Sequence, residues 1–136
     1  MIVESGQILS TTLHLAGRGS ASLYRPAYIR HPVVLWVAAD ARNFAWLYRH
    51  FVALLDEWRF RTGKASHASA RLVPVFARFV TTTDPPERFA NCTPFKSEAD
   101  IHAAYRRTLL EKWRRDAPPP RWSRRGPPDF SKTLKA

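Results

Sequence analysis

The sequence is poor in the residue types that most often build disulfides, metal sites and phosphate loops. It has one cysteine, Cys92, so an internal disulfide is excluded and a reducing compartment fits best. Only five glycines are present, and they form neither a phosphate loop nor a dinucleotide fingerprint. No histidine lies three or four residues from another histidine or from Cys92. We therefore expect no metal and no cofactor.

Long apolar runs are also missing. No stretch reaches the roughly 18 apolar residues that a transmembrane helix needs, so we expect no membrane span and no membrane partner. The first residues lack a basic segment followed by a long apolar run, and so predict no secretory signal. The expected location is the cytoplasm, which would be that of a bacterial host if a bacteriophage encodes the protein.

Acidic residues are scarce relative to basic ones. The chain has 22 Lys and Arg against 11 Asp and Glu, a net charge of +11, and 17 of the cations are arginine. Arginine binds phosphate as a planar fork and stacks on rings, which favours nucleic acid as the partner, DNA ahead of RNA, or a phosphorylated nucleotide. A protein partner stays open. An arginine-rich coding bias would give the same composition.

The chain has enough apolar residues to form a core, since 45% of its 136 residues are hydrophobic. Apolar residues recur at helical spacing, and we predict an all-α fold with one compact domain of four to five helices. The domain is expected over residues 1–116, with a basic, proline-rich tail over 117–136. Helices are predicted at 2–16, 32–39, 40–62, 66–80 and 97–115.

The segment from Asp40 to Gly63 predicts the central helix. Asp40 is a candidate N-cap and Gly63 a candidate left-handed C-cap. One face of this helix is apolar, and it consists of Phe44, Leu47, Phe51, Leu54, Leu55 and Trp58. In the same way, Ser66 is predicted to cap the next helix, and Ser97 with Asp100 resembles the capping box of the last.

The flank of the apolar face is polar and predicts a pocket. By helical arithmetic, one line beside the face holds Asn43, Trp46, His50, Glu57 and Arg61, and the residues just after the turn include Lys64, His67, Ser69 and Arg71. Glu57 and His67 are the candidate catalytic residues. Arg61, Lys64 and Arg71 would bind phosphate, and Trp46 would stack a base. Asn43, His50, Ser69 and His31 would line the pocket. The alternative is a solvated flank with a Glu57–Arg61 pair at i, i+4 spacing.

The end of the chain is the second candidate site. From residue 101 onward there are 10 cations and 3 acids, a net charge of +7 in 36 residues. Arg121, Arg124 and Arg125 surround Trp122, and this basic-aromatic cluster would bind phosphates while Trp122 stacks on a base. Trp122 pinning the tail to the domain is the alternative. Lys112 lies within the inward stripe of the last helix, where it would either extend to solvent or reach a site and bind phosphate or nucleic acid.

Five strings together resemble a group of small bacteriophage proteins of unassigned activity: VESGQILSTTLHL, LYRPAYIRHPVVLW, NFAWLYRHFVALLDEWRFRTGKASHAS, AYRRTLLEKWRR and RWSRRGPPDF. The resemblance covers nearly the whole chain, and its most specific part is the spacing of Glu57, Arg61, Gly63, Lys64 and His67. Members of the group carry an extra His- and Lys-rich segment before the first helix. The resemblance therefore implies that a chain opening at Met1 is a shortened member.

The group in turn is similar to phage pyrimidine-dimer DNA glycosylases of the endonuclease V type, which are small, basic and helical and flip a base out of DNA. That family uses the amine of an N-terminal threonine, whereas this chain begins Met1-Ile2. No catalytic residue is carried over. The resemblance implies a DNA-binding protein with a repair, glycosylase-like or DNA-modifying role. The alternatives are a binding module without chemistry and a nucleotide-processing enzyme.

Overall fold

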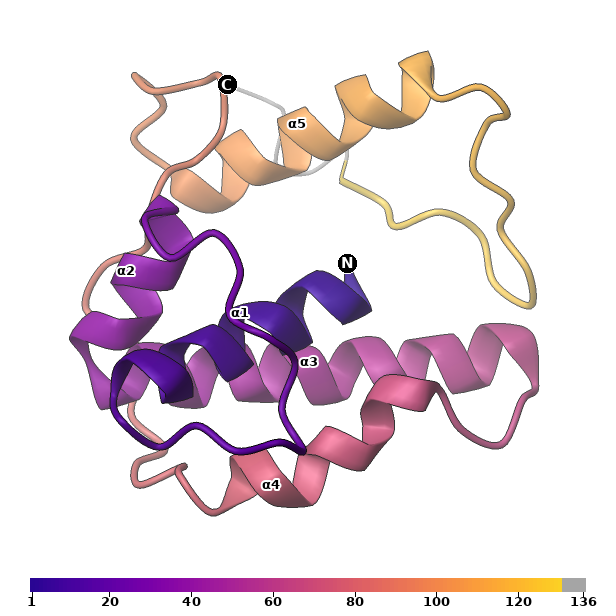
Figure 1. Cartoon of the computed structure of the whole chain (residues 1–136). Helices are drawn as coiled ribbons and strands as arrows, with labels where there is room; N and C mark the ends of the chain where they lie inside the picture. The colour runs from indigo at the N-terminus through magenta and orange to yellow at the C-terminus, as the bar shows by residue number, and fades with distance from the viewer. Residues whose placement is uncertain (131–136) are drawn as a thin grey trace. The chain divides into compact units, whose positions relative to one another are not determined.

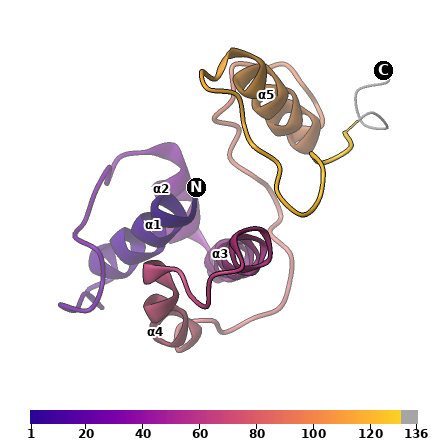
Figure 2. The ribbon, with the colours of Figure 1, turned by 90° about the vertical axis from the view of Figure 1, so that its right-hand side faces the viewer.

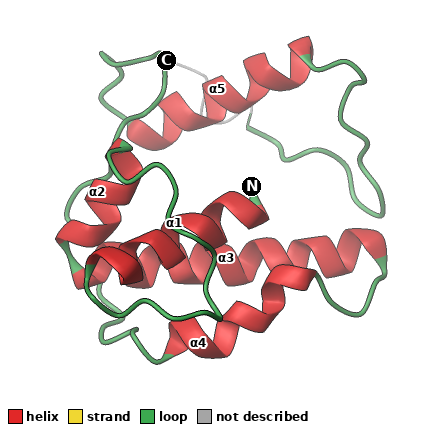
Figure 3. Cartoon of the chain, viewed as in Figure 1, coloured by secondary structure: helices red, strands yellow, loops and turns green. Residues whose placement is uncertain are grey.

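The computed structural model describes residues 1–130, and every regular element in that range is helical (Figure 3). The all-α prediction is confirmed. In chain order the elements are α1 Ile2–Leu15, α2 Pro32–Ala39, α3 Ala41–Thr62, the 3-10 helix η1 Ala68–Leu72, α4 Val73–Ala77 and α5 Ile101–Arg115 (Figure 1). Residues 131–136, the end of the predicted tail, lie outside the described residues. Among the helices of residues 1–130, none combines the length and apolar character that crossing a bilayer requires.

The chain divides into two compact units, Met1–Ala90 and Asn91–Ala136. The first unit contains α1 to α4, and the second contains α5 with the segments on either side of it. This division lies earlier in the chain than the predicted one after residue 116, because α5 and the basic tail belong to the same unit.

The central helix α3 begins and ends where its caps predict. The Asp40 carboxylate accepts a hydrogen bond from the backbone N–H of Arg42 at 2.8 Å. Gly63 adopts φ 68°, a left-handed conformation that costs glycine little, and its N–H donates to the carbonyl of Arg59 at 2.9 Å.

The apolar face of α3 forms the core of the first unit. Helices α1, α2 and α3 pack against one another, while η1 contacts α1 and α4 contacts α3. Figure 2 shows α3 nearly end-on, with α4 beneath it and α1 to one side. The buried residues that contact one another are Leu9, Leu13, Leu23, Val37, Phe44, Leu47, Phe51, Leu55, Leu72 and Phe76. The rings of Phe51 and Phe76 meet edge to face at 5.6 Å, which links α3 to α4.

Helix α1 carries a polar stripe, formed by the buried Ser10 and Thr11 and the half-buried His14, that holds the following loop. The Ser10 hydroxyl accepts from the N–H of Tyr24 at 3.2 Å, and the His14 ring bonds the Tyr24 carbonyl at 3.1 Å. Thr11 Oγ1 accepts from the N–H of Ala27 at 3.0 Å and donates to its carbonyl at 3.3 Å. These side chains satisfy backbone groups of Tyr24 and Ala27 where the loop packs against α1.

Two predicted helix starts need correction. Ser66 does not cap the segment after α3, since the imidazole of His67 accepts from the N–H of Ser69 at 3.0 Å and starts η1. The segment then continues only as far as Ala77 in α4. Before α5, Asp100 is itself the N-cap and accepts from the N–H groups of His102 and Ala103, at 2.8 and 3.1 Å. A carboxylate at the cap position reaches both donors directly, so Ser97 is not needed there.

Candidate functional site

The candidate catalytic residue Glu57 is held by Arg61. Nε of Arg61 donates to Oε1 of Glu57 at 2.6 Å, one helical turn apart on α3. The Arg61 side chain is only 17% exposed, so the guanidinium lies against the protein. This is the i, i+4 pair that the alternative interpretation of the flank predicts.

Lys64 and His67 both contact Trp58, at the end of α3. The ring of His67 meets the indole edge-on at 5.1 Å, and Nζ of Lys64 lies 6.0 Å from the indole centroid. Lys64 is exposed and His67 is half-buried. Trp58, which was predicted to lie on the apolar face, therefore contacts two of the predicted site residues.

Trp46 and His50 form a separate aromatic cluster with Trp36 and Phe89. The imidazole of His50 stacks on Trp46 with centroids 5.3 Å apart and an angle of 8°. Trp46 also contacts Trp36 at 6.1 Å and Phe89 at 5.0 Å, both edge to face. Burial lowers the pKa of His50, because desolvation disfavours its charged form. Rings in such direct contact anchor the Phe89 segment and leave no space between them for a base.

Asn43 also has a structural role. Its side chain is buried, and Nδ2 donates to the carbonyl of Trp36 in α2 at 2.8 Å. That carbonyl lies in the last turn of α2, where backbone acceptors lack partners within the helix. Asn43 thus joins the end of α2 to the start of α3.

Ser69 and Arg71 converge on Tyr24. The hydroxyls of Ser69 and Tyr24 lie 2.7 Å apart, and the Arg71 guanidinium lies 5.4 Å from the centre of the Tyr24 ring. Arg71 also donates to the carbonyl of Ser22. Both residues hold the loop after α1 in place, and Arg71 does so with the group that was predicted to bind phosphate.

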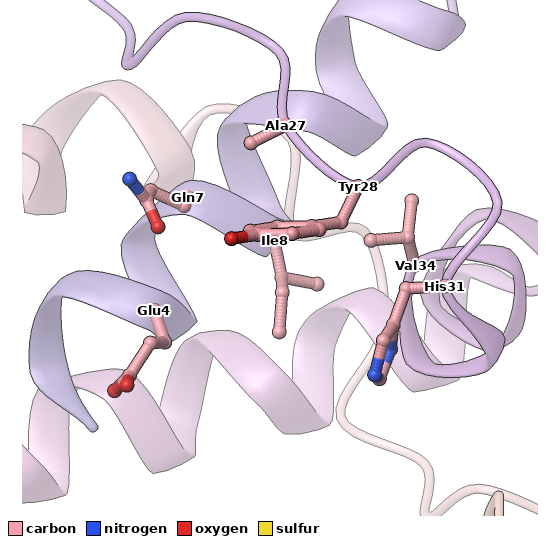
Figure 4. Close-up of a pocket in the computed structure, with 7 residues that line it drawn as sticks. All are labelled: Glu4, Gln7, Ile8, Ala27, Tyr28, His31 and Val34. Atoms are coloured by element: carbon pink, nitrogen blue, oxygen red, sulfur yellow. The ribbon is translucent and has the colours of Figure 1, made fainter.

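His31 is the N-cap of α2, where Nδ1 accepts from the N–H of Val33 at 3.2 Å. It also lines a cavity of about 350 Å³ (Figure 4). None of the other predicted pocket residues lines this cavity. Its walls come from α1, the loop after it and the start of α2.

Lys112 extends to solvent rather than to a site. Its Nζ contacts both carboxylate oxygens of Asp116, at 2.8 and 2.7 Å, and its side chain is 63% exposed. Asp116 is the C-cap of α5, so this pair closes the last turn of the helix.

The second unit gathers rings and arginines around α5. Trp113 meets Trp122 edge to face at 4.9 Å and stacks against Phe130 at 6.0 Å. Trp122 therefore pins the tail to α5, which is the alternative that the sequence left open. Arg114, Arg121 and Arg124 are exposed and have no acidic partner among residues 1–130. We call the set of Trp113, Trp122, Phe130, Arg106, Arg114, Arg121, Arg124 and Arg125 the basic-aromatic surface.

Sequence reasoning missed Trp113 and Phe130 in this surface. Both were visible as aromatic residues within the basic segment, at positions 113 and 130. No local pattern connects a helical tryptophan to a phenylalanine 17 residues later across prolines, so only their contact in the folded unit reveals the set.

Comparisons of the chain with protein-family models, with curated proteins and with solved structures find no match. The resemblance to the phage proteins and to the pyrimidine-dimer glycosylases stays a prediction.

Proposed function

We propose that the protein binds nucleic acid, DNA in the first instance, through the basic-aromatic surface. The observation that carries the proposal is that three exposed guanidinium groups without acidic partners among the described residues, those of Arg114, Arg121 and Arg124, lie in the same unit as the contact between Trp113 and Trp122. An unpaired arginine fork is free to bind a phosphate with two parallel hydrogen bonds.

The aromatic residues support this role by fixing the tail. Trp122 contacts Trp113, so the arginines on either side of Trp122 are attached to a helix instead of a free chain. Arg106 lies 5.9 Å from the centre of the Phe130 ring, which adds a cation to the same set. Pre-organised cations lose less conformational entropy on binding than cations on a mobile tail. In this proposal Trp122 positions the arginines and does not stack on a base.

The proposal is of a binding module. Repair, DNA modification or nucleotide processing through Glu57 and His67 remains a prediction from the sequence, and the carboxylate of Glu57 is already bound to Arg61. A cytoplasmic location agrees with an exposed, unpaired cysteine at position 92.

The test is a matched pair of charge-neutralising variants. One replaces Arg114, Arg121 and Arg124 by Gln. The control replaces Arg49, Arg78 and Arg88, which are exposed in the first unit and likewise lack acidic partners among residues 1–130. Both variants change the net charge equally, so a difference in their affinity for DNA shows which unit contains the binding site.

We expect the first variant to lose at least roughly tenfold in affinity for a fluorescent DNA duplex, because three phosphate contacts are removed. The control variant should retain most of the affinity. Fluorescence anisotropy at low salt measures both. Equal losses would mean that total charge alone attracts DNA, and absence of binding by the unmodified protein would refute the proposal.

A further inference from the structure

The cavity of the first unit has a mainly apolar interior and a few polar groups at its edges. Ile8 from α1, Ala27 from the loop and Val34 from α2 supply the apolar wall, and the polar groups belong to Glu4, Gln7, Tyr28 and His31. Its volume of about 350 Å³ is in the range of small-molecule sites, which bind ligands by apolar contact and orient them with few hydrogen bonds.

Tyr28 is unusual in both conformation and exposure. Its φ of 53° places a bulky residue in the left-handed region, and its side chain is 79% exposed. Figure 4 shows its ring edge-on between Glu4 and His31, with the Ile8 side chain below it. A strained backbone that holds an aromatic ring over a cavity is typical of a site where a ligand is stacked.

The polar groups at the two ends of the cavity are complementary in hydrogen-bonding character. Glu4 offers only acceptors when ionised. At the other end, Nδ1 of His31 accepts from the N–H of Val33, so the neutral imidazole carries its proton on Nε2 and offers a donor. Figure 4 shows Glu4 and His31 at opposite ends of the cavity, with Gln7 beside Glu4.

The Glu4 carboxylate is available to a ligand. It contacts the amino group of Met1, but both side chains are more than 60% exposed. An ion pair in that setting is weak, because water screens it, so a ligand with two aligned donors can replace it.

We propose that this cavity binds a single nucleobase with a guanine-type edge. A flat ring would lie against Tyr28 and Ile8. Its adjacent N–H donors would bind the carboxylate of Glu4 as a pair, and its ring nitrogen N7, away from those donors, would accept from Nε2 of His31. The base can come from a free nucleoside or from an unstacked position in a strand, since both present the same edges. The site does not depend on the basic-aromatic surface, because all its residues lie in the first unit.

The test uses neutral nucleosides, because they carry no phosphate and so do not report on the basic-aromatic surface. Binding of guanosine, inosine and adenosine to the full-length protein is measured by equilibrium dialysis. Inosine lacks only the exocyclic amino group of guanosine. We expect guanosine to bind roughly tenfold more tightly than inosine, as one lost hydrogen bond to a carboxylate predicts.

Variants then assign the contacts. Glu4→Gln should remove the preference for guanosine over inosine, and Tyr28→Ala should weaken the binding of every nucleoside. These side chains are exposed, so we expect each variant to keep its helical content, which circular dichroism measures. No measurable guanosine binding, or a preference that survives Glu4→Gln, would overturn the proposal.

A second arm separates the two sources of the base. The protein is titrated with a thymidine oligonucleotide that contains one guanine and with the same oligonucleotide without it. A preference for the guanine strand that Glu4→Gln abolishes assigns the site to a base within a strand. Equal binding of the two strands, beside selective binding of guanosine, assigns it to the free nucleoside.

Discussion

At the scale of single residues, most polar side chains that the sequence marks as site candidates bind other parts of the protein. Asn43 ties α2 to α3, Ser69 holds Tyr24, and His67 starts η1. Their residue types suit these tasks, since the amide of Asn43 and the imidazole of His67 satisfy backbone groups, and the Ser69 hydroxyl satisfies the hydroxyl of a tyrosine. A polar residue beside an apolar face is thus as consistent with backbone satisfaction as with a pocket.

Asp40 is the residue whose charge state the structure most clearly fixes. The Arg42 guanidinium bonds both its carboxylate oxygens, at 2.6 to 3.2 Å, and lowers the pKa of Asp40 to about 2 from its usual 3.8, with help from the Arg42 N–H. A carboxyl group whose pKa is lower in the folded state adds stability above its unfolded pKa. That contribution is lost as the pH falls from about 4 towards about 2.

The replacement Asp40→Asn therefore has a pH-dependent cost. Asparagine keeps an N-cap acceptor but does not titrate. We expect the original protein to be more stable than the variant near pH 6, with the difference shrinking steadily towards about pH 2. Urea denaturation at several pH values measures the free energy of unfolding of both. A difference that stays constant over this range would show that the Asp40 charge contributes nothing to folding.

At the scale of elements, the helices that have both a capping residue and apolar residues at helical spacing could be predicted from the sequence. Asp40 and Gly63 bound α3 as expected, and Pro32 begins α2. Contacts between distant segments could not be predicted, because helical spacing and capping residues report only on neighbours a few positions apart in the sequence. The stripe of Ser10, Thr11 and His14 is the clearest case, since its partners are backbone atoms more than nine residues away.

The candidate sites also contain one part that the sequence predicts and one part that only the fold reveals. The Glu57–Arg61 pair follows from i, i+4 spacing and forms as that alternative predicts. The cavity beside Tyr28 needs α1, a loop and α2 to meet, and no pattern in the printed sequence places Glu4 opposite His31.

The polar stripe of α1 predicts a difference between two neighbouring threonines. Thr11→Val keeps the shape of the side chain but leaves the N–H and carbonyl of Ala27 without their partner, and we expect it to cost about 1–3 kcal/mol of stability. The matched control is Thr12→Val, because the Thr12 hydroxyl donates to the Ile8 carbonyl within α1 itself. Chemical denaturation compares the two, and equal effects would mean that the stripe does not hold the loop.

At the scale of the whole molecule, charge and rings are distributed differently over the two units. Aromatic residues of the first unit lie mainly in the core and in the Trp36–Trp46–Phe89 cluster, whereas Trp113, Trp122 and Phe130 lie among arginines. With a net charge of +11, the protein is attracted to any polyanion at low salt. The dependence of binding on salt is therefore more informative than affinity at one salt concentration.

Each phosphate contact to duplex DNA releases counterions and makes log K fall with log salt by about 0.9. Replacing Arg114, Arg121 and Arg124 by Gln should therefore make the slope shallower by about 2 to 3. The corresponding replacements at Arg49, Arg78 and Arg88 should change it by less than about 1. Anisotropy titrations over a series of salt concentrations give both slopes, and identical slopes would show that these three arginines touch no phosphate.

The way α1 secures its neighbouring loop has a practical consequence. Ser10, Thr11 and His14 all bind main-chain atoms, those of Tyr24 and Ala27, and Arg71 does the same at Ser22. None of these bonds uses the side chain of the exposed Arg25, whereas Pro26 fixes its own backbone φ and is best left in place. A fluorophore or an affinity handle can therefore be attached at position 25 without changing the path of the chain, in the same loop as Tyr28.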